Sequence, residues 1–74
     1  MSLIRVTYRV EGAESDSRQI MEHNVAVQVT KFRGSMLPAR HPVAPGDLNA
    51  GDMFCLGSAS GRCATVVRVE AAGS

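Results

Sequence analysis

Apolar and polar side chains alternate over residues 3–11, strictly so from Ile4 onward. The apolar positions of this segment are Ile4, Val6, Tyr8 and Val10. A period of two with β-branched residues is typical of a half-buried β-strand, so residues 3–11 are predicted to form one. Gly, Ser and acidic residues dominate positions 12–17, so the strand is expected to end there in a turn or loop.

A second alternating segment covers residues 24–32, with Val25, Val27 and Val29 on one face. The preceding residues, 16–23, fit two interpretations. They could form a short helix capped by Ser15 or Asp16. Alternatively, one long strand begins near Arg18 and carries a bulge near His23–Asn24 that restores the apolar face. We favour the bulged strand, because it could pair back on residues 3–11.

Glycine and proline interrupt the next segment, residues 34–47, at Gly34, Pro38, Pro42, Pro45 and Gly46. Proline has no backbone donor and restricts the residue before it, so a central strand or a helix is disfavoured. The segment is therefore predicted to be a long ordered loop that is extended in places. Turn-forming residues on both sides of Leu48 indicate that this leucine is buried between two turns.

Residues 53–56 and 62–70 are predicted to form a hairpin around a loop at 58–61, and the register decides the state of the cysteines. A three-residue loop places Cys55 opposite Cys63. A four-residue loop instead puts Phe54 and Leu56 on the face of Cys63, Val67 and Val69, which buries more apolar surface. We favour the second register, with free thiols on opposite faces. Residues 71–74 are expected to fray.

These segments predict one small all-β domain over residues 1–74, with room for one short helix. The expected architecture is an antiparallel meander of roughly four or five strands, curled into a barrel or half-barrel. The predicted core consists of Ile4, Val6, Tyr8, Val10, Val25, Val27, Val29, Phe54, Leu56, Val67 and Val69.

Composition narrows the function classes. The chain has 74 residues, 45% of them hydrophobic, a net charge of +1, and Tyr8, Phe32 and Phe54 as its aromatic residues. Near-neutral charge and few rings argue against a strongly basic or base-stacking nucleic-acid binder. No apolar run is long enough for a transmembrane helix. The first residues lack the apolar centre of a signal peptide, so a cytoplasmic location without membrane association is expected.

Candidate chemistry is sparse. Gly57-Ser58-Ala59-Ser60-Gly61 lacks the central serine of a nucleophile elbow. An anion could still be held there by backbone N–H groups, Ser58, Ser60 and Arg62, although a plain hairpin loop is the simpler interpretation. Neither the histidines, His23 and His41, nor the widely spaced cysteines fit a metal site. The sequence therefore predicts no catalytic residues, no metal and no cofactor.

Charge is unevenly distributed, and residues 31–41 contain basic residues without any acid. Arginine and methionine near an aromatic ring are enriched at protein interfaces. The segment is accordingly predicted to bind a partner, unless it is a solvated loop whose leucine only closes the core. The candidate contacts are Lys31, Arg33, Met36, Leu37, Arg40 and His41.

The favoured function is a non-enzymatic protein-binding module, an adaptor or inhibitor that docks on a larger protein. Its size and character are comparable to accessory proteins of phages and plasmids, anti-CRISPR inhibitors among them, although no motif identifies such a family. One alternative is a small-barrel nucleic-acid binder using Arg5, Arg9, Lys31, Arg33, Arg40 and Arg62. Another is a structural or assembly protein, or a homodimer, that associates through an uncharged edge strand at residues 25–30.

Overall fold

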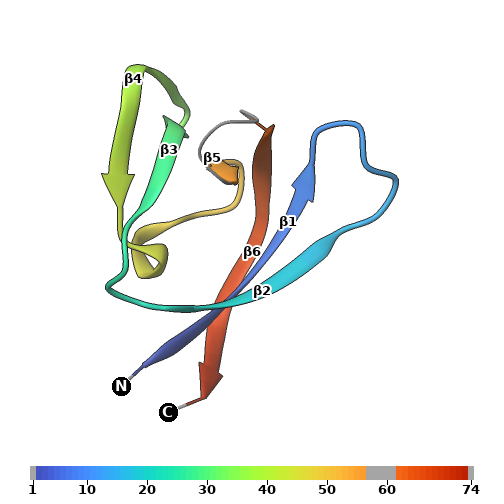
Figure 1. The fold of residues 1–74 in the computed structure, drawn as a ribbon, viewed down its shortest axis with the longest axis vertical. Helices are drawn as coiled ribbons and strands as arrows, with labels where there is room; N and C mark the ends of the chain where they lie inside the picture. Colours follow the sequence, from blue (N-terminus) through green and yellow to red (C-terminus); the bar gives the residue numbers. More distant parts are fainter. Residues whose placement is uncertain (1, 57–61, 74) are drawn as a thin grey trace.

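The computed structural model describes residues 2–56 and 62–73. Within them the chain forms an antiparallel sheet of six strands with one 3₁₀ turn (Figure 1). The strands are β1 (Leu3–Val10), β2 (Ser17–Glu22), β3 (Val27–Phe32), β4 (Ser35–Val43), β5 (Met53–Leu56) and β6 (Arg62–Gly73), and the turn is η1 (Pro45–Asp47). The prediction of an antiparallel all-β chain is confirmed, with more strands than expected.

The strand order is β2-β1-β6-β5-β3-β4, so β2 and β4 form the two edges of the sheet. No strand pair among the described residues joins β2 to β4, so the sheet is not closed and the expected barrel is not confirmed. β1 lies between β2 and β6, and because β1 and β6 are antiparallel, the start of β1 lies beside the end of β6 (Figure 1). The β3–β4 hairpin stands on the other side of the short β5.

Residues 17–22 form a strand and not a helix, and they pair with β1 as the bulged-strand interpretation required. The continuous strand through residue 32 is wrong, however. A turn at residues 23–26 separates β2 from β3, and the Val25 N–H donates to the Glu22 carbonyl (3.2 Å). Val25 lies in this turn with 56% of its surface exposed, so it does not belong to the core.

The predicted loop at 34–47 is also wrong for its first part, because residues 35–43 form β4. Among the described strands β4 pairs with β3 alone, and prolines are tolerated on an edge strand whose outer side needs no donors. The partner of β3 changes from His41 at Val29 to Met36 at Lys31, so β4 carries an irregular bulge between Met36 and His41 that contains Pro38. Proline correctly excluded a central strand here, but it did not exclude an edge strand.

The core is built from both halves of the sheet. The buried hydrophobic cluster is Val6, Tyr8, Val29, Val43, Leu48, Phe54, Ala64 and Val66. Tyr8 and Phe54 meet edge to face, with ring centroids 5.3 Å apart. Of the remaining predicted core residues, Ile4, Val10, Val27 and Val69 pack partly buried against the cluster. The expected burial of Leu48 is confirmed.

A bulge in β6 explains why Val67 was assigned wrongly to the core. Thr7 pairs with Arg68, but Tyr8 pairs with Val66, so the ladder passes over Val67. Because one extra residue exchanges the two faces of a strand, Val66 is buried, whereas Val67 is 42% exposed. Val69, beyond the bulge, returns to the core side as predicted.

The cysteine prediction is wrong as well. Cys55 lies directly opposite Cys63 in the β5–β6 pair, and the two form a disulfide. The structure thus has the register in which the two cysteines face each other. The favoured register relied on an alternation that includes Val67, and the bulge at Val67 interrupts that alternation. The prediction that the chain frays from residue 71 is also wrong for residues 71–73, because Ala71 and Gly73 pair with β1. No helix in the described part of the chain is long and apolar enough to span a membrane.

Candidate functional site: the β3–β4 hairpin

A tight turn at Arg33 and Gly34 connects β3 to β4. Phe32 pairs with Ser35, so the turn contains only these two residues. Their φ values are 52° and 84°, the conformation of a type I′ turn, whose twist matches that of the flanking strands. Glycine adopts this conformation freely and Asn or Asp tolerate it, but arginine has no such adaptation. Arg33 is the only residue other than glycine with positive φ in the described part of the chain.

A buried carboxylate holds this turn. Asp52 is 2% exposed, and its Oδ1 accepts a hydrogen bond from the main-chain N–H of Arg33 (3.0 Å). The other oxygen, Oδ2, accepts from the main-chain N–H of Asn49 (2.8 Å). The Asp52 carbonyl also accepts from the Val66 N–H (2.7 Å). One residue thus connects the hairpin turn, the residues after η1, and β6.

The Arg33 side chain extends over the neighbouring ring. Its guanidinium carbon lies 5.1 Å from the centroid of the Phe32 ring, within the range of a cation–π contact. Arg33 is exposed while Phe32 is half-buried against the core. The guanidinium of Arg33 is therefore exposed to solvent, while the hydrogen bond to Asp52 holds its backbone and the Phe32 ring lies beneath its side chain.

The hairpin brings most of the predicted contact residues to one region, but with different exposures. Met36 is 67% exposed, the highest fraction among the exposed large hydrophobic residues in the described part of the chain. Arg40 and His41 are exposed, and Lys31 is half-buried. Leu37 instead packs against the core, which matches the alternative interpretation that this leucine closes the core. Met36, and not Leu37, is therefore the apolar side chain available to a partner.

The open edge of β4 is poorly suited to pairing with another strand. Pro38 and Pro42 carry no N–H, and the bulge between Met36 and His41 distorts the ladder. Prolines and bulges on an edge strand discourage the addition of a further strand. Recognition at this hairpin would depend on its side chains.

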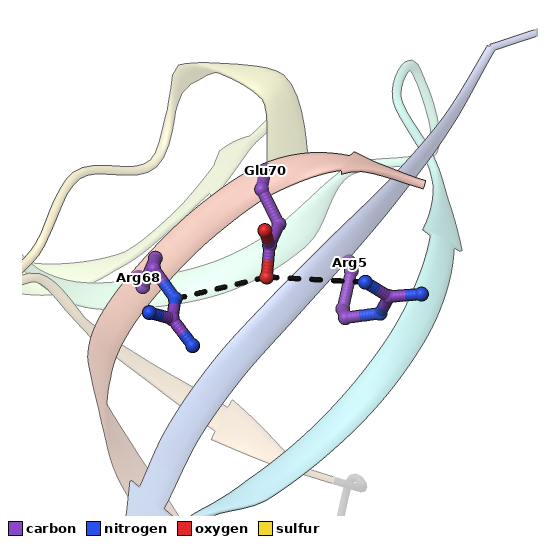
Figure 2. Close-up of polar contacts among 3 residues, drawn as sticks. All are labelled: Arg5, Arg68 and Glu70. Atoms are coloured by element: carbon purple, nitrogen blue, oxygen red, sulfur yellow. Dashed lines mark ion pairs between the residues drawn. The ribbon is translucent and has the colours of Figure 1, made fainter. Parts of the chain in front are cut away.

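Three basic residues outside the hairpin, Arg5, Arg9 and Arg68, are paired with acids. Figure 2 shows Glu70 between Arg5 and Arg68, with its Oε1 3.9 Å from Arg5 Nη1 and 3.6 Å from Arg68 Nε. The Nε of Arg9 lies 2.9 Å from Oδ1 of Asp16. The residues proposed to contact nucleic acid are thus spread over β1, the hairpin and the start of β6, where Arg62 lies.

The other candidate sites add little. Ser58 and Ser60 of the anion-binding hypothesis lie outside the described residues, while Arg62 is exposed at the start of β6. His23 follows β2 and His41 lies in β4, and among the described strands neither of these pairs with β5 or β6, which carry the disulfide. Within residues 2–56 and 62–73, no three His, Cys, Asp or Glu side chains form a group that could hold a metal ion.

Sequence reasoning missed Asp52, the residue that fixes the hairpin. The local signal was present, because residues 49–52 show a turn composition, and Asp52 closes that turn through its bond to Asn49. Its bond to Arg33 spans 19 residues and has no signature in the local pattern.

Comparison with known proteins gives no relative. No protein-family model, curated protein or solved structure matches this chain.

Proposed function

We propose that this chain is a non-enzymatic protein-binding module, an adaptor or inhibitor that docks on a larger protein through the β3–β4 hairpin. The observation that carries the proposal is the conformation of Arg33. A non-glycine residue at positive φ is disfavoured by roughly 1–2 kcal/mol, and such strain persists where the surroundings impose it. Here Asp52 imposes it, and the strained residue presents its charge to solvent.

The side chains around this turn suit a protein partner. An exposed methionine is a flexible and polarizable contact residue, and arginine combines a charge with a planar donor fork. Met36 supplies the apolar anchor, while Arg33 and Arg40 supply charge to either side of it. Lys31 and His41 extend the basic character of the same hairpin, so acidic groups are expected on the partner's surface.

A nucleic-acid partner remains the second candidate, and the same hairpin would provide its contacts. It is less favoured because Arg5 and Arg9 are engaged with Glu70 and Asp16. The two partner classes differ in salt dependence, since phosphate contacts release counterions and weaken steeply as salt rises.

A matched pair of variants tests the proposal. Immobilised wild type, Met36→Ser and Val67→Ser are each exposed to a lysate of the native source, with and without nuclease. Met36 and Val67 are both exposed apolar residues, but they lie on different strands. We expect a protein captured by wild type and Val67→Ser, insensitive to nuclease, and lost with Met36→Ser. Equal capture by all three would place the contact elsewhere.

The proposed location is the cytoplasm, and the disulfide gives this proposal a separate test. Cytoplasmic thiols are kept reduced, so the Cys55–Cys63 bond would be open there. Trapping thiols with an alkylating reagent at the moment of lysis should label both cysteines. An unlabelled, disulfide-bonded protein would indicate an oxidising compartment instead.

A further inference from the structure

The second edge of the sheet, β2, differs from β4 because it contains no proline and no register shift. Its exposed outer-face residues are Arg18, Ile20 and Glu22, which alternate with Gln19 and Met21. Ile20 is 48% exposed. A regular edge strand of this kind can accept another strand.

The backbone groups available at this edge can be assigned from the ladder. The His23 N–H donates to the Ser2 carbonyl (3.2 Å), which continues the β1–β2 register. Pairs in an antiparallel ladder alternate between hydrogen-bonded and non-hydrogen-bonded. His23, Met21 and Gln19 therefore direct their backbone groups to β1.

It follows that Arg18, Ile20 and Glu22 direct theirs to the open side. The hydrogen bonds on the other side of β1 agree with this assignment. There the Glu11 N–H donates to the Cys63 carbonyl (3.3 Å), so the odd-numbered residues of β1 direct their backbone groups to β6 and the even-numbered ones direct theirs to β2. The Glu22 carbonyl already accepts from Val25, and its second lone pair stays available.

We propose that β2 pairs antiparallel with β2 of a second copy of this chain, centred on Ile20. Only residues with outward backbone groups can form hydrogen-bonded pairs, so Arg18, Ile20 and Glu22 must pair among themselves. With Ile20 opposite Ile20 of the other copy, Arg18 of each copy lies opposite Glu22 of the other. Each pair then joins opposite charges on one face, flanking an apolar contact.

The charges support a second copy over an unrelated strand. Arg18 and Glu22 belong to none of the ion pairs among the described residues, whereas Arg5, Arg9 and Arg68 all do. The two residues lie four positions apart on one strand, too far to pair with each other. A two-fold axis midway between the two Ile20 residues gives both charges a partner, because it places Arg18 of each copy beside Glu22 of the other.

Charge reversal tests both the dimer and its register by analytical ultracentrifugation from low micromolar to millimolar concentration. The wild type is expected to dimerise as concentration rises. Arg18→Glu places two acids opposite each other, and Glu22→Arg two arginines. Each variant alone should therefore weaken association by about tenfold. Arg40→Glu makes the same charge change on β4 and should leave association unchanged.

Mixing the two single variants provides the decisive measurement. In a mixed pair, Glu at 18 faces Arg at 22, and the native Arg18 faces the native Glu22. The mixture should therefore associate far better than either variant alone and close to the wild type, which also shows that both variants are folded. The proposal is overturned by a wild type that stays monomeric at millimolar concentration, by a mixture no better than its components, or by association that only Arg40→Glu weakens. These outcomes are independent of whether the hairpin binds a partner.

Discussion

The carboxylate of Asp52 accepts a hydrogen bond from the main-chain N–H of Arg33 (Oδ1–N 3.0 Å), 19 residues earlier in the chain. Arg33 is also the residue whose backbone φ of 52° an arginine rarely adopts. The buried acid therefore stabilises the turn at the point where the turn is strained. It also places Met36 and Arg40 relative to the rest of the sheet, since both lie on the strand that follows.

Asp52→Ala should lower the free energy of unfolding by about 2–3 kcal/mol, because the N–H groups of Arg33 and Asn49 both lose their acceptor. Urea denaturation followed by circular dichroism measures the change. Asp47→Ala serves as the control, since Asp47 is exposed, and its loss should stay within about 0.5 kcal/mol. Equal effects of the two substitutions would mean that the carboxylate does not hold the turn.

Arg33→Asn should raise the free energy of unfolding by up to about 1 kcal/mol, because Asn-Gly is the preferred pair in a type I′ turn. Loss of the contact with Phe32 offsets part of this gain. The same variant should bind the hairpin's partner more weakly than wild type. Arg33→Val is the contrasting variant, since a β-branched residue is strongly disfavoured at positive φ and should destabilise the fold. If Arg33→Asn proves less stable than wild type, the turn is not strained.

Reduction of the Cys55–Cys63 bond should lower the free energy of unfolding by about 2.5 kcal/mol, the value expected for a short closed loop. The comparison uses denaturation of the wild type with and without reductant. The double variant Cys55→Ala/Cys63→Ala should show no response to reductant. Intact mass of the purified protein, kept under oxidising conditions and alkylated without reductant, provides the direct check. Two alkylated thiols in that sample would contradict the bond.

Val66→Ala should cost about 2 kcal/mol, whereas Val67→Ala should change stability by less than about 0.5 kcal/mol. The two valines are adjacent and chemically identical, but Val66 is 2% exposed and Val67 42%. Denaturant midpoints of the two variants measure the difference directly. A larger loss of stability for Val67→Ala than for Val66→Ala would mean that Val67 is the buried residue and would contradict the bulge.

The sequence predicted β1 well because its alternation is uninterrupted, and Val6 and Tyr8 are buried as expected. The prediction failed in β6. There the pattern of Val66, Val67 and Val69 is compatible with burial of either Val66 or Val67, and only the pairing with β1 shows where the bulge lies. It also failed at β4, because a proline-rich composition does not distinguish an edge strand from a loop.

The candidate site was predicted by composition and only partly by geometry. A basic segment without acids identified the hairpin, but which of Met36 and Leu37 is exposed depends on the sheet and not on the local pattern. The bond between Asp52 and Arg33 joins distant positions, so neither periodicity nor turn propensity could indicate it.

The pairing of β1 with β6 determines when this chain can fold. Val6 lies opposite Val69, so the middle of the sheet closes only after residues far apart in the sequence meet. Contacts of such long separation slow folding, because the entropy of closing the chain is lost before they form. While the chain is being synthesised, β1 and β2 can already pair, but the other side of β1 stays unpaired until β6 has been synthesised. Folding of this sheet is therefore expected to be completed only after β6 has been synthesised, and to be slow for its size.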